Sequence, residues 1–205
     1  GSGSQGGADG AASAASFKQP WVLAGSADGR YLYISESLGH RIRRLDLSSQ
    51  QVTTVAGSTS GSSGSTDGTG TAARFYHPAQ ISLSPDGTSL YIADAYTSKI
   101  RKLDVASSAV TTVVVASVAG AGLDHPMGVA VSLDGSTLYI ADTDRHRVLK
   151  HVLQSGATSL LAGLTSTRGF DDGIGTAARF NEPWAVTLSL YGAHLYVSDH
   201  SNHAI

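Results

Sequence analysis

The residues best placed for chemistry stand immediately before four prolines that recur along the chain. They are Gln19, His77, His125 and Glu182. Two imidazoles and a carboxylate are common zinc ligands, so convergence of these positions would suit a metal ion. Ligands carried by repeats that are not adjacent would, however, lie too far apart to share one ion. Hydrogen bonding by these side chains at the rim of the molecule is the simpler interpretation. We therefore expect no resident metal and no other cofactor.

A second recurring set is acidic and ends a strand-like run in each repeat. Its members are Glu36, Asp94, Asp142 and Asp199. A ring of carboxylates would suit a cation, but Asp also bonds nearby backbone N–H groups readily. We interpret these acids as caps on the turns that follow them. Histidines recur at one position after three of the acids, and we interpret His40, His146 and His203 as hydrogen-bonding turn residues.

Basic residues gather on a third run of each repeat. They are Arg41, Arg43, Arg44, Lys99, Arg101, Lys102, Arg145, Arg147 and Lys150. A basic face can bind RNA, but interleaved Asp residues and a net charge of −2 oppose a strong phosphate-binding field. The charge therefore argues against a nucleic-acid partner, and we expect these side chains to form solvated strand faces.

Composition excludes several other chemistries. The 205 residues include no cysteine, so disulfides, thiolate metal sites and cysteine nucleophiles are absent. No apolar run approaches the roughly 18 to 20 residues of a membrane span. The sequence also contains no Gly-x-Ser-x-Gly elbow, no His-Glu-x-x-His pair and no glycine-rich phosphate loop. The 41% hydrophobic content is enough for a folded core.

Short alternating strands must position these residues. Each proline begins an alternating run that ends in a turn, as in residues 81–84 before Pro85-Asp86-Gly87, and a second run then ends in the acid. A third run is apolar on one face and basic on the other, and a fourth follows it. No segment keeps a helical period. Four antiparallel strands recurring every 48 to 58 residues predict β-propeller blades, with the first strand beside the channel.

The acid-ended strand and the residues after it carry a family resemblance. Residues 197–205, Val-Ser-Asp-His-Ser-Asn-His-Ala-Ile, resemble the core of the NHL repeat, and residues 34–42 and 140–148 are looser copies. The Asp-Gly…Phe-x-x-Pro block before the first, second and fourth prolines is also similar to that family. The resemblance implies an all-β propeller of NHL type with six four-stranded blades.

The expected domain is an arc of about three and a half blades of that ring. We assign the repeats to about residues 9–57, 67–120, 121–163 and a truncated 172–205. The missing blades would come from the rest of a longer chain or from a neighbouring subunit.

The positions that follow the four prolines separate this chain from one enzyme of the NHL-like group. In the peptide-amidating lyase, as the resemblance implies, metal-binding histidines follow this proline, whereas here the positions hold Trp21, Ala79, Met127 and Trp184. We expect instead an apolar and partly aromatic channel mouth. Trp21, Met127 and Trp184 would meet a ligand there, or fill the channel, beside the four residues that precede the prolines.

Together these features predict a non-catalytic binding or scaffolding module that recognises protein, peptide or glycan through its loops and channel mouth. Two alternatives stay open. One is a metal-dependent lyase or hydrolase whose ligands lie mainly on blades outside this segment, and the other is a structural subunit of an extracellular or filamentous assembly. The frequent use of the resembled family in ectodomains favours an extracellular or cell-surface location.

Overall fold

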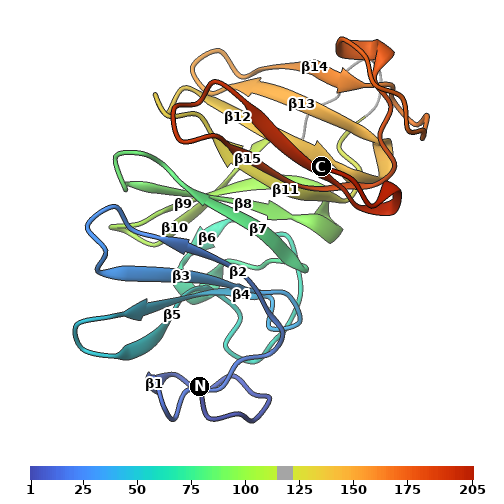
Figure 1. Ribbon diagram of the computed structural model, residues 1–205. Helices are drawn as coiled ribbons and strands as arrows, with labels where there is room; N and C mark the ends of the chain where they lie inside the picture. The colour runs from blue at the N-terminus through green and yellow to red at the C-terminus, as the bar shows by residue number, and fades with distance from the viewer. Residues whose placement is uncertain (115–121) are drawn as a thin grey trace.

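A computed structural model describes residues 1–114 and 122–205 as a fan of antiparallel sheets (Figure 1). The sheets follow one another in chain order from the N-terminus to the C-terminus, so each repeat forms one blade. The junction expected between the second and third repeats, at residues 120 and 121, lies outside the described residues.

Four strands per blade are present in the first three sheets, and the fourth sheet contains two. The strands that make the blades are β2 (Pro20–Gly25), β3 (Tyr31–Glu36), β4 (Arg41–Asp46), β5 (Gln51–Gly57), β7 (Pro78–Leu83), β8 (Ser89–Asp94), β9 (Lys99–Asp104), β10 (Ala109–Val114), β11 (Pro126–Val131), β12 (Thr137–Asp142), β13 (Arg147–Val152), β14 (Ala157–Gly163), β15 (Pro183–Leu188) and β16 (Leu195–Asp199). The expectation of an all-β propeller with four-stranded antiparallel blades is confirmed.

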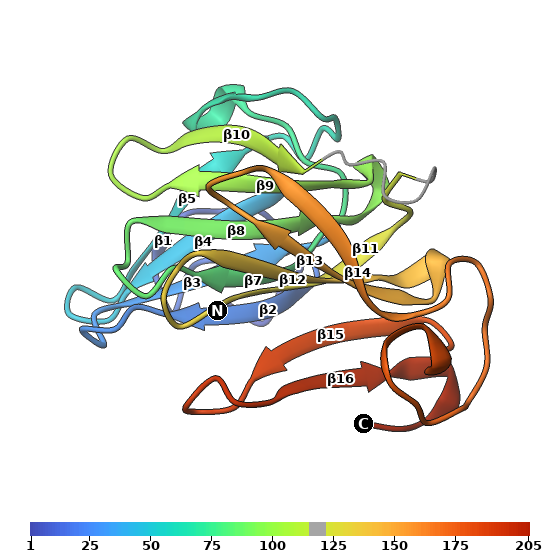
Figure 2. The ribbon, with the colours of Figure 1, turned by 90° about the horizontal axis from the view of Figure 1, so that it is seen from above.

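The first strand of each blade is the innermost, and Figure 2 shows β7, β11 and β15 following one another in successive blades. Gly29, Gly87, Gly135 and Gly192 close the hairpins to the second strands with φ between 68° and 72°. That left-handed backbone is cheap for glycine, so the Asp-Gly and Tyr-Gly turns fix where each blade folds back.

Apolar layers between successive blades form the core. One layer joins blades 1 and 2 through residues such as Tyr33, Phe75 and Leu90, and another joins blades 2 and 3 through Ile100 and Leu138. A smaller layer packs blade 3 on blade 4. Blades 2 and 3 are therefore covered on both faces by a neighbouring blade.

Two short strands from the glycine-rich segments extend the outer edges. They are β1 (Gly10–Ala11), which pairs with β5, and β6 (Gly68–Thr69), which pairs with β10. Asp9 and Asp67 bond the backbone N–H of Thr54 and Thr112 at 2.9 and 3.0 Å, which fastens each segment to its blade. Within the described residues no helix is long and apolar enough to cross a membrane. Helical turns are limited there to five 3-10 turns, η1 (Gly70–Ala72), η2 (Ala95–Thr97), η3 (Thr143–Arg145), η4 (Gly175–Ala177) and η5 (His200–Asn202).

Candidate functional site

A bulge at the start of each inner strand aims one side chain into the channel. The prolines pair with the acids that end the second strands, as in Pro126 with Asp142, and the register then shifts, so that Met127 has no partner opposite it. The same shift follows the prolines of β2, β7 and β15. Because a bulge re-aims the extra residue, it turns the residue after each proline toward the channel mouth.

These residues line a single cavity of about 400 Å³ at the mouth of the channel. It is lined by Gln19, Trp21, Ser37, Leu38, His77, Ala79, Tyr96, His125, Met127 and Trp184. The structure thus brings together the positions on either side of the prolines, apart from Glu182. That carboxylate lies beside the cavity, where it accepts a hydrogen bond from the Ser201 hydroxyl at 2.7 Å.

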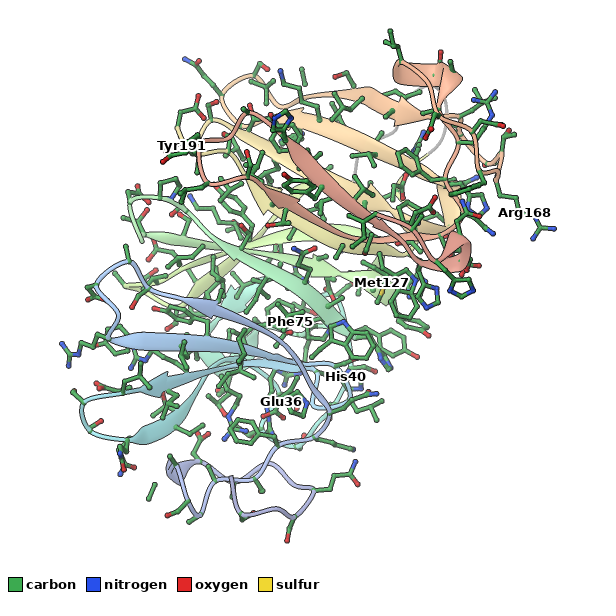
Figure 3. All side chains as sticks on the ribbon, in the orientation of Figure 1. Glu36, His40, Phe75, Met127, Arg168 and Tyr191 are labelled. Atoms are coloured by element: carbon green, nitrogen blue, oxygen red, sulfur yellow. The ribbon has the colours of Figure 1, made fainter. Side chains whose placement is uncertain are left out.

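Aromatic rings dominate this mouth. Trp21 of blade 1 and Trp184 of blade 4 meet across the channel with their ring centroids 6.1 Å apart. His200 stacks on Trp184 at 3.6 Å and with 2° between the planes, which holds that indole in place. Met127 lines the same cavity as these indoles, and in Figure 3 Met127 and His40 lie on one side of the molecule while Tyr191 lies on the opposite side.

On the facing wall, Tyr96 packs against two imidazoles. Its ring centroid lies 4.4 Å from that of His77 and 4.7 Å from that of His125. The cavity therefore lies between a pair of indoles and a cluster of phenol and imidazole rings. Such rigid, half-exposed aromatic side chains are typical anchors in binding sites.

The recurring acids support the loop that leads to each proline. Asp94, Asp142 and Asp199 each accept a hydrogen bond of 2.7 Å from the backbone N–H two residues before the proline, at Tyr76, Asp124 and Asn181. Glu36 bonds Lys18 in the same way at 3.2 Å. The expectation that the acids cap the following turn is wrong, because no side-chain cap bond is made at η2, η3 or η5. The end of the second strand lies beside the loop that leads to the proline of the same blade. The acid there therefore accepts a hydrogen bond from that loop and not from the turn that follows the strand.

Buried arginines neutralise three of these acids, Glu36, Asp94 and Asp142, and the expectation of solvated basic faces is wrong for four of the basic residues. Arg41, Arg43, Arg101 and Arg147 are almost fully buried. Arg101 lies 3.0 Å from Asp94, Arg147 lies 2.7 Å from Asp142, and Glu36 is paired with both Arg41 and Arg43. The segment that precedes the first strand of the same repeat covers this face of the third strand, so a long cation there points inward to its acid. The other five basic side chains are half-buried.

Burial raises the pKa of Asp94 to about 6, although the bonds from the Tyr76 N–H and Arg101 act in the opposite direction. Burial likewise raises the pKa of Asp142, against the effects of the Asp124 N–H and Arg147. These carboxylates are therefore held in an environment that penalises their charge, and the arginines are needed to keep them ionised.

The residues that follow the second strand tie each blade to the next. His40 accepts a hydrogen bond at Nδ1 from the backbone N–H of His77 at 3.3 Å, and His146 accepts one from Glu182 at 3.1 Å. Ser98 occupies the same position and accepts from His125 at 3.5 Å. All six residues have φ between 52° and 57°, a left-handed backbone that is uncommon outside glycine. His203 has the same backbone conformation in blade 4.

The tie between His40 and His77 should weaken in acid. Burial lowers the pKa of His40, and the charges of His77 and Lys18 lower it further. The fold thus favours neutral His40, whose contribution is complete above the ordinary pKa of about 6.5 and is lost as the pH falls toward the lower folded value. We expect His40→Asn, which tolerates the left-handed backbone, to remove the loss of stability that the wild type shows as the pH falls below about 6.5.

Urea unfolding of the wild type and of H40N at several pH values measures this difference. The exposed His194 provides the control, because H194N should leave the pH profile of unfolding unchanged. Parallel profiles for the wild type and H40N would contradict the assigned role of His40.

Metal binding by the pre-proline residues has no geometric support in the described part of the chain. Groups of three or more His, Asp or Glu side chains placed to hold a metal ion do not occur among those residues. His77 Nδ1 instead lies 3.0 Å from the Ser37 hydroxyl, and His125 Nδ1 lies 3.6 Å from Asp144. Apart from Gln19 and Ser37, the other residues that line the cavity are apolar or aromatic.

Sequence reasoning missed several of the lining residues. Leu38 and Tyr96 each stand two residues after the acid of their blade, and Ser37 stands one after it. The turn after the second strand therefore borders the mouth as the pre-proline loop does. The shared distance from the acid was the available signal, but the residue types differ from blade to blade and hid it.

Comparison with known proteins places the fold in a family. A family model described as "Lactonase, 7-bladed beta-propeller" matches residues 20–167. Its description names seven blades, where the resemblance to NHL repeats implied six. Protein SUPPRESSOR OF QUENCHING 1, chloroplastic, of Arabidopsis thaliana is 32% identical over 111 residues, which are 51% of this chain and 10% of the relative.

Solved structures share the fold at low identity. A chain of the nidogen/laminin complex matches with a TM-score of 0.64 and 16% identity over 89% of this chain and 57% of its own length. Virginiamycin B lyase from Staphylococcus aureus, solved with quinupristin as the inactive H270A variant, matches with a TM-score of 0.58 and 17% identity over 89% and 50%. The chain thus spans about half the length of these structures and a tenth of the curated relative.

Proposed function

The chain belongs to the lactonase, 7-bladed beta-propeller family, and from that premise we propose that it is a non-catalytic binding module whose ligand enters the mouth of the channel. The observation that carries the proposal is the aromatic cavity between Trp21, Trp184 and Tyr96. Its walls come from all four blades, and its anchors are fixed by bulges and by stacking. A rigid scaffold that presents aromatic anchors in a concave site suits recognition.

We further ascribe the repeats to the NHL type. Support comes from the recurring acid, the left-handed residue at the histidine position and the Asp-Gly segments that fasten to the blade edges. In an NHL-type repeat of this kind, the recurring residues have structural roles. The acids and histidines hold the blades and loops, which leaves the bulge residues and their neighbours to meet a ligand.

Hydrolysis is the competing function, because Ser37 and His77 form a hydroxyl–imidazole pair beside the cavity. Burial lowers the pKa of His77, and the charge of His125 lowers it further, so the ring is a neutral acceptor at neutral pH. Both residues already serve as ties, however. The Ser37 side chain reaches from blade 1 to His77 of blade 2, and the His77 backbone bonds His40 of blade 1. This double use favours a structural task for the pair.

Printed peptide and glycan arrays test the proposal with the wild type, Trp21→Ala and Tyr191→Ala. Removing an aromatic anchor costs about 2 kcal/mol or more, so W21A should bind wild-type ligands roughly 30-fold more weakly. Tyr191 is 86% exposed on the opposite side of the molecule, and Y191A should bind as the wild type does. Equal binding by W21A and the wild type, or no wild-type binding on either array, would overturn the proposal.

A further inference from the structure

We propose that the cavity at the channel mouth accepts a neutral saccharide, with a sugar ring lying against Trp21 and Trp184. This inference rests on the proposed binding function and specifies its ligand.

The two indoles and Tyr96 supply flat apolar surfaces. Trp21 is 43% exposed, so its face is accessible, and Trp184 is kept in place by the His200 ring stacked on it. A pyranose whose substituents are all equatorial has flat C–H faces that pack on such rings. The 49° angle between the indoles presents two apolar surfaces at different inclinations to a ligand.

The polar groups of the cavity are an amide, a hydroxyl and two imidazoles. Gln19 offers an exposed amide, Ser37 a hydroxyl, and His77 and His125 offer imidazoles. Amides, hydroxyls and imidazoles both donate and accept, which matches the hydroxyl groups of a sugar. Ser37 and His77 already bond each other, but the buried His125 Nε2 has no hydrogen-bond partner among the described residues. An aromatic or aliphatic peptide side chain packed there would leave it unpaired at a cost in free energy, whereas a sugar hydroxyl would pair with it.

The charged side chains lie outside this lining, and Asp144 among them is 3.6 Å from the His125 ring. The described residues that line the cavity include no carboxylate and no lysine or arginine. Nearby, Arg145 lies 3.4 Å from Asp124, and Glu182 bonds Ser201. A charged ligand would lose its hydration in this cavity without meeting an opposite charge, so the lining selects a neutral one.

A cross-channel contact limits the depth of the site. One residue beyond Ala79 along β7, the Gln80 side chain donates to the Val186 carbonyl at 2.7 Å and accepts from the Val186 N–H at 3.1 Å. It passes Gly128 of β11, where an added Cβ would lie 3.0 Å from Gln80 Oε1 and 2.7 Å from the Trp184 carbonyl oxygen. The bridge forms a floor beneath the cavity, whose volume is that of a small-molecule site.

Tryptophan fluorescence tests the inference directly, because the only two tryptophans of the chain both line the cavity. The probes are cellotetraose and chitotetraose as neutral saccharides, tetragalacturonate as a charged one, and a neutral tetrapeptide containing phenylalanine. We expect a neutral saccharide to produce a saturable change in tryptophan emission, and we expect its affinity to be unaffected by salt. Its affinity should fall at least about 10-fold in W21A and in Gln19→Ala, and it should be unchanged in Y191A.

The outcomes separate the two proposals. Binding of the peptide without any saccharide would overturn the saccharide inference and leave the binding function standing. Tighter binding of tetragalacturonate than of the neutral saccharides would also overturn the inference. No response to any of the four probes would overturn the inference, and only the arrays would then decide the binding function. Circular dichroism of W21A and Q19A checks that each variant has kept the fold.

Discussion

Replacing Arg101 with methionine is expected to lower the free energy of unfolding by about 3 to 5 kcal/mol, because it leaves the Asp94 carboxylate buried without its cation. Arg101 is 0% exposed, and its guanidinium also bonds the carbonyls of Thr66 and Arg74 at 3.0 Å. It further contacts Asp67 at 2.6 Å. The substitution therefore loosens the pre-proline loop and the edge strand β6 together with the ion pair. Equilibrium unfolding in urea measures the loss.

Lys102 provides the matched control on the same strand. Its side chain is half-buried on the opposite face of β9, and Lys102→Met should change stability by no more than about 0.5 kcal/mol. Equal stability of R101M and K102M would contradict a stabilising role for the buried arginines. It would favour the alternative that the basic residues of the third strands lie on solvated faces.

Gly128→Ala is the second substitution for which we expect a large effect. The added Cβ would lie 2.7 Å from the Trp184 carbonyl oxygen and 2.9 Å from the Ala141 Cβ, distances that real contacts do not reach. Blade 3 would have to move away from blade 4, at a cost of about 1 to 3 kcal/mol. The Gln80 bridge lies at the same place, so the floor of the cavity should open and the tryptophan emission should shift.

Gly25 in β2 tests whether the effect is specific to the close approach. An added Cβ there meets only Leu32, at an ordinary 3.7 Å, so Gly25→Ala should leave both stability and emission close to those of the wild type. A G128A variant with wild-type stability and emission would show that the inner strands do not meet as closely as described.

The repeat itself was predictable because local chemistry specifies it. Asp-Gly turns, alternating apolar residues and a proline at the start of each inner strand determine the hairpins without reference to distant contacts. The residues around the prolines share one position in every repeat. A propeller places equivalent positions around one channel, so their meeting at the mouth follows from the repeat alone, apart from Glu182.

The burial of the arginines, and their pairing with the acids, could not be predicted by the same reasoning. A charged residue that alternates with Ile42 or Ile100 usually faces solvent, and the sequence pattern therefore predicted solvated strand faces. In the blade the segment before the first strand covers this face, and Arg43 and Arg101 point toward acids seven residues earlier. The pairing depends on where that segment crosses the third strand, which strand alternation does not encode. The recurring acid and the basic residue five or seven positions later were the signal.

The hydrogen bonds that join one blade to the next could likewise not be predicted from the sequence. His40 was expected to be a turn residue, and its left-handed backbone fits that role. Its partner, however, is the backbone N–H of His77 in the next blade, and such a contact appears only when two repeats are placed side by side. Leu38 and Tyr96 escaped notice because a lining position need not keep one residue type.

Chemical footprinting of Trp21 tests most directly whether the channel mouth is the binding site. N-bromosuccinimide oxidises accessible indoles, and mass spectrometry of digested protein separates Trp21 from Trp184. The 43% exposed Trp21 should be oxidised in the free protein and protected when a ligand identified on the arrays is present at saturation. Oxidation of Trp21 at an unchanged rate while that ligand is bound would contradict binding at the mouth.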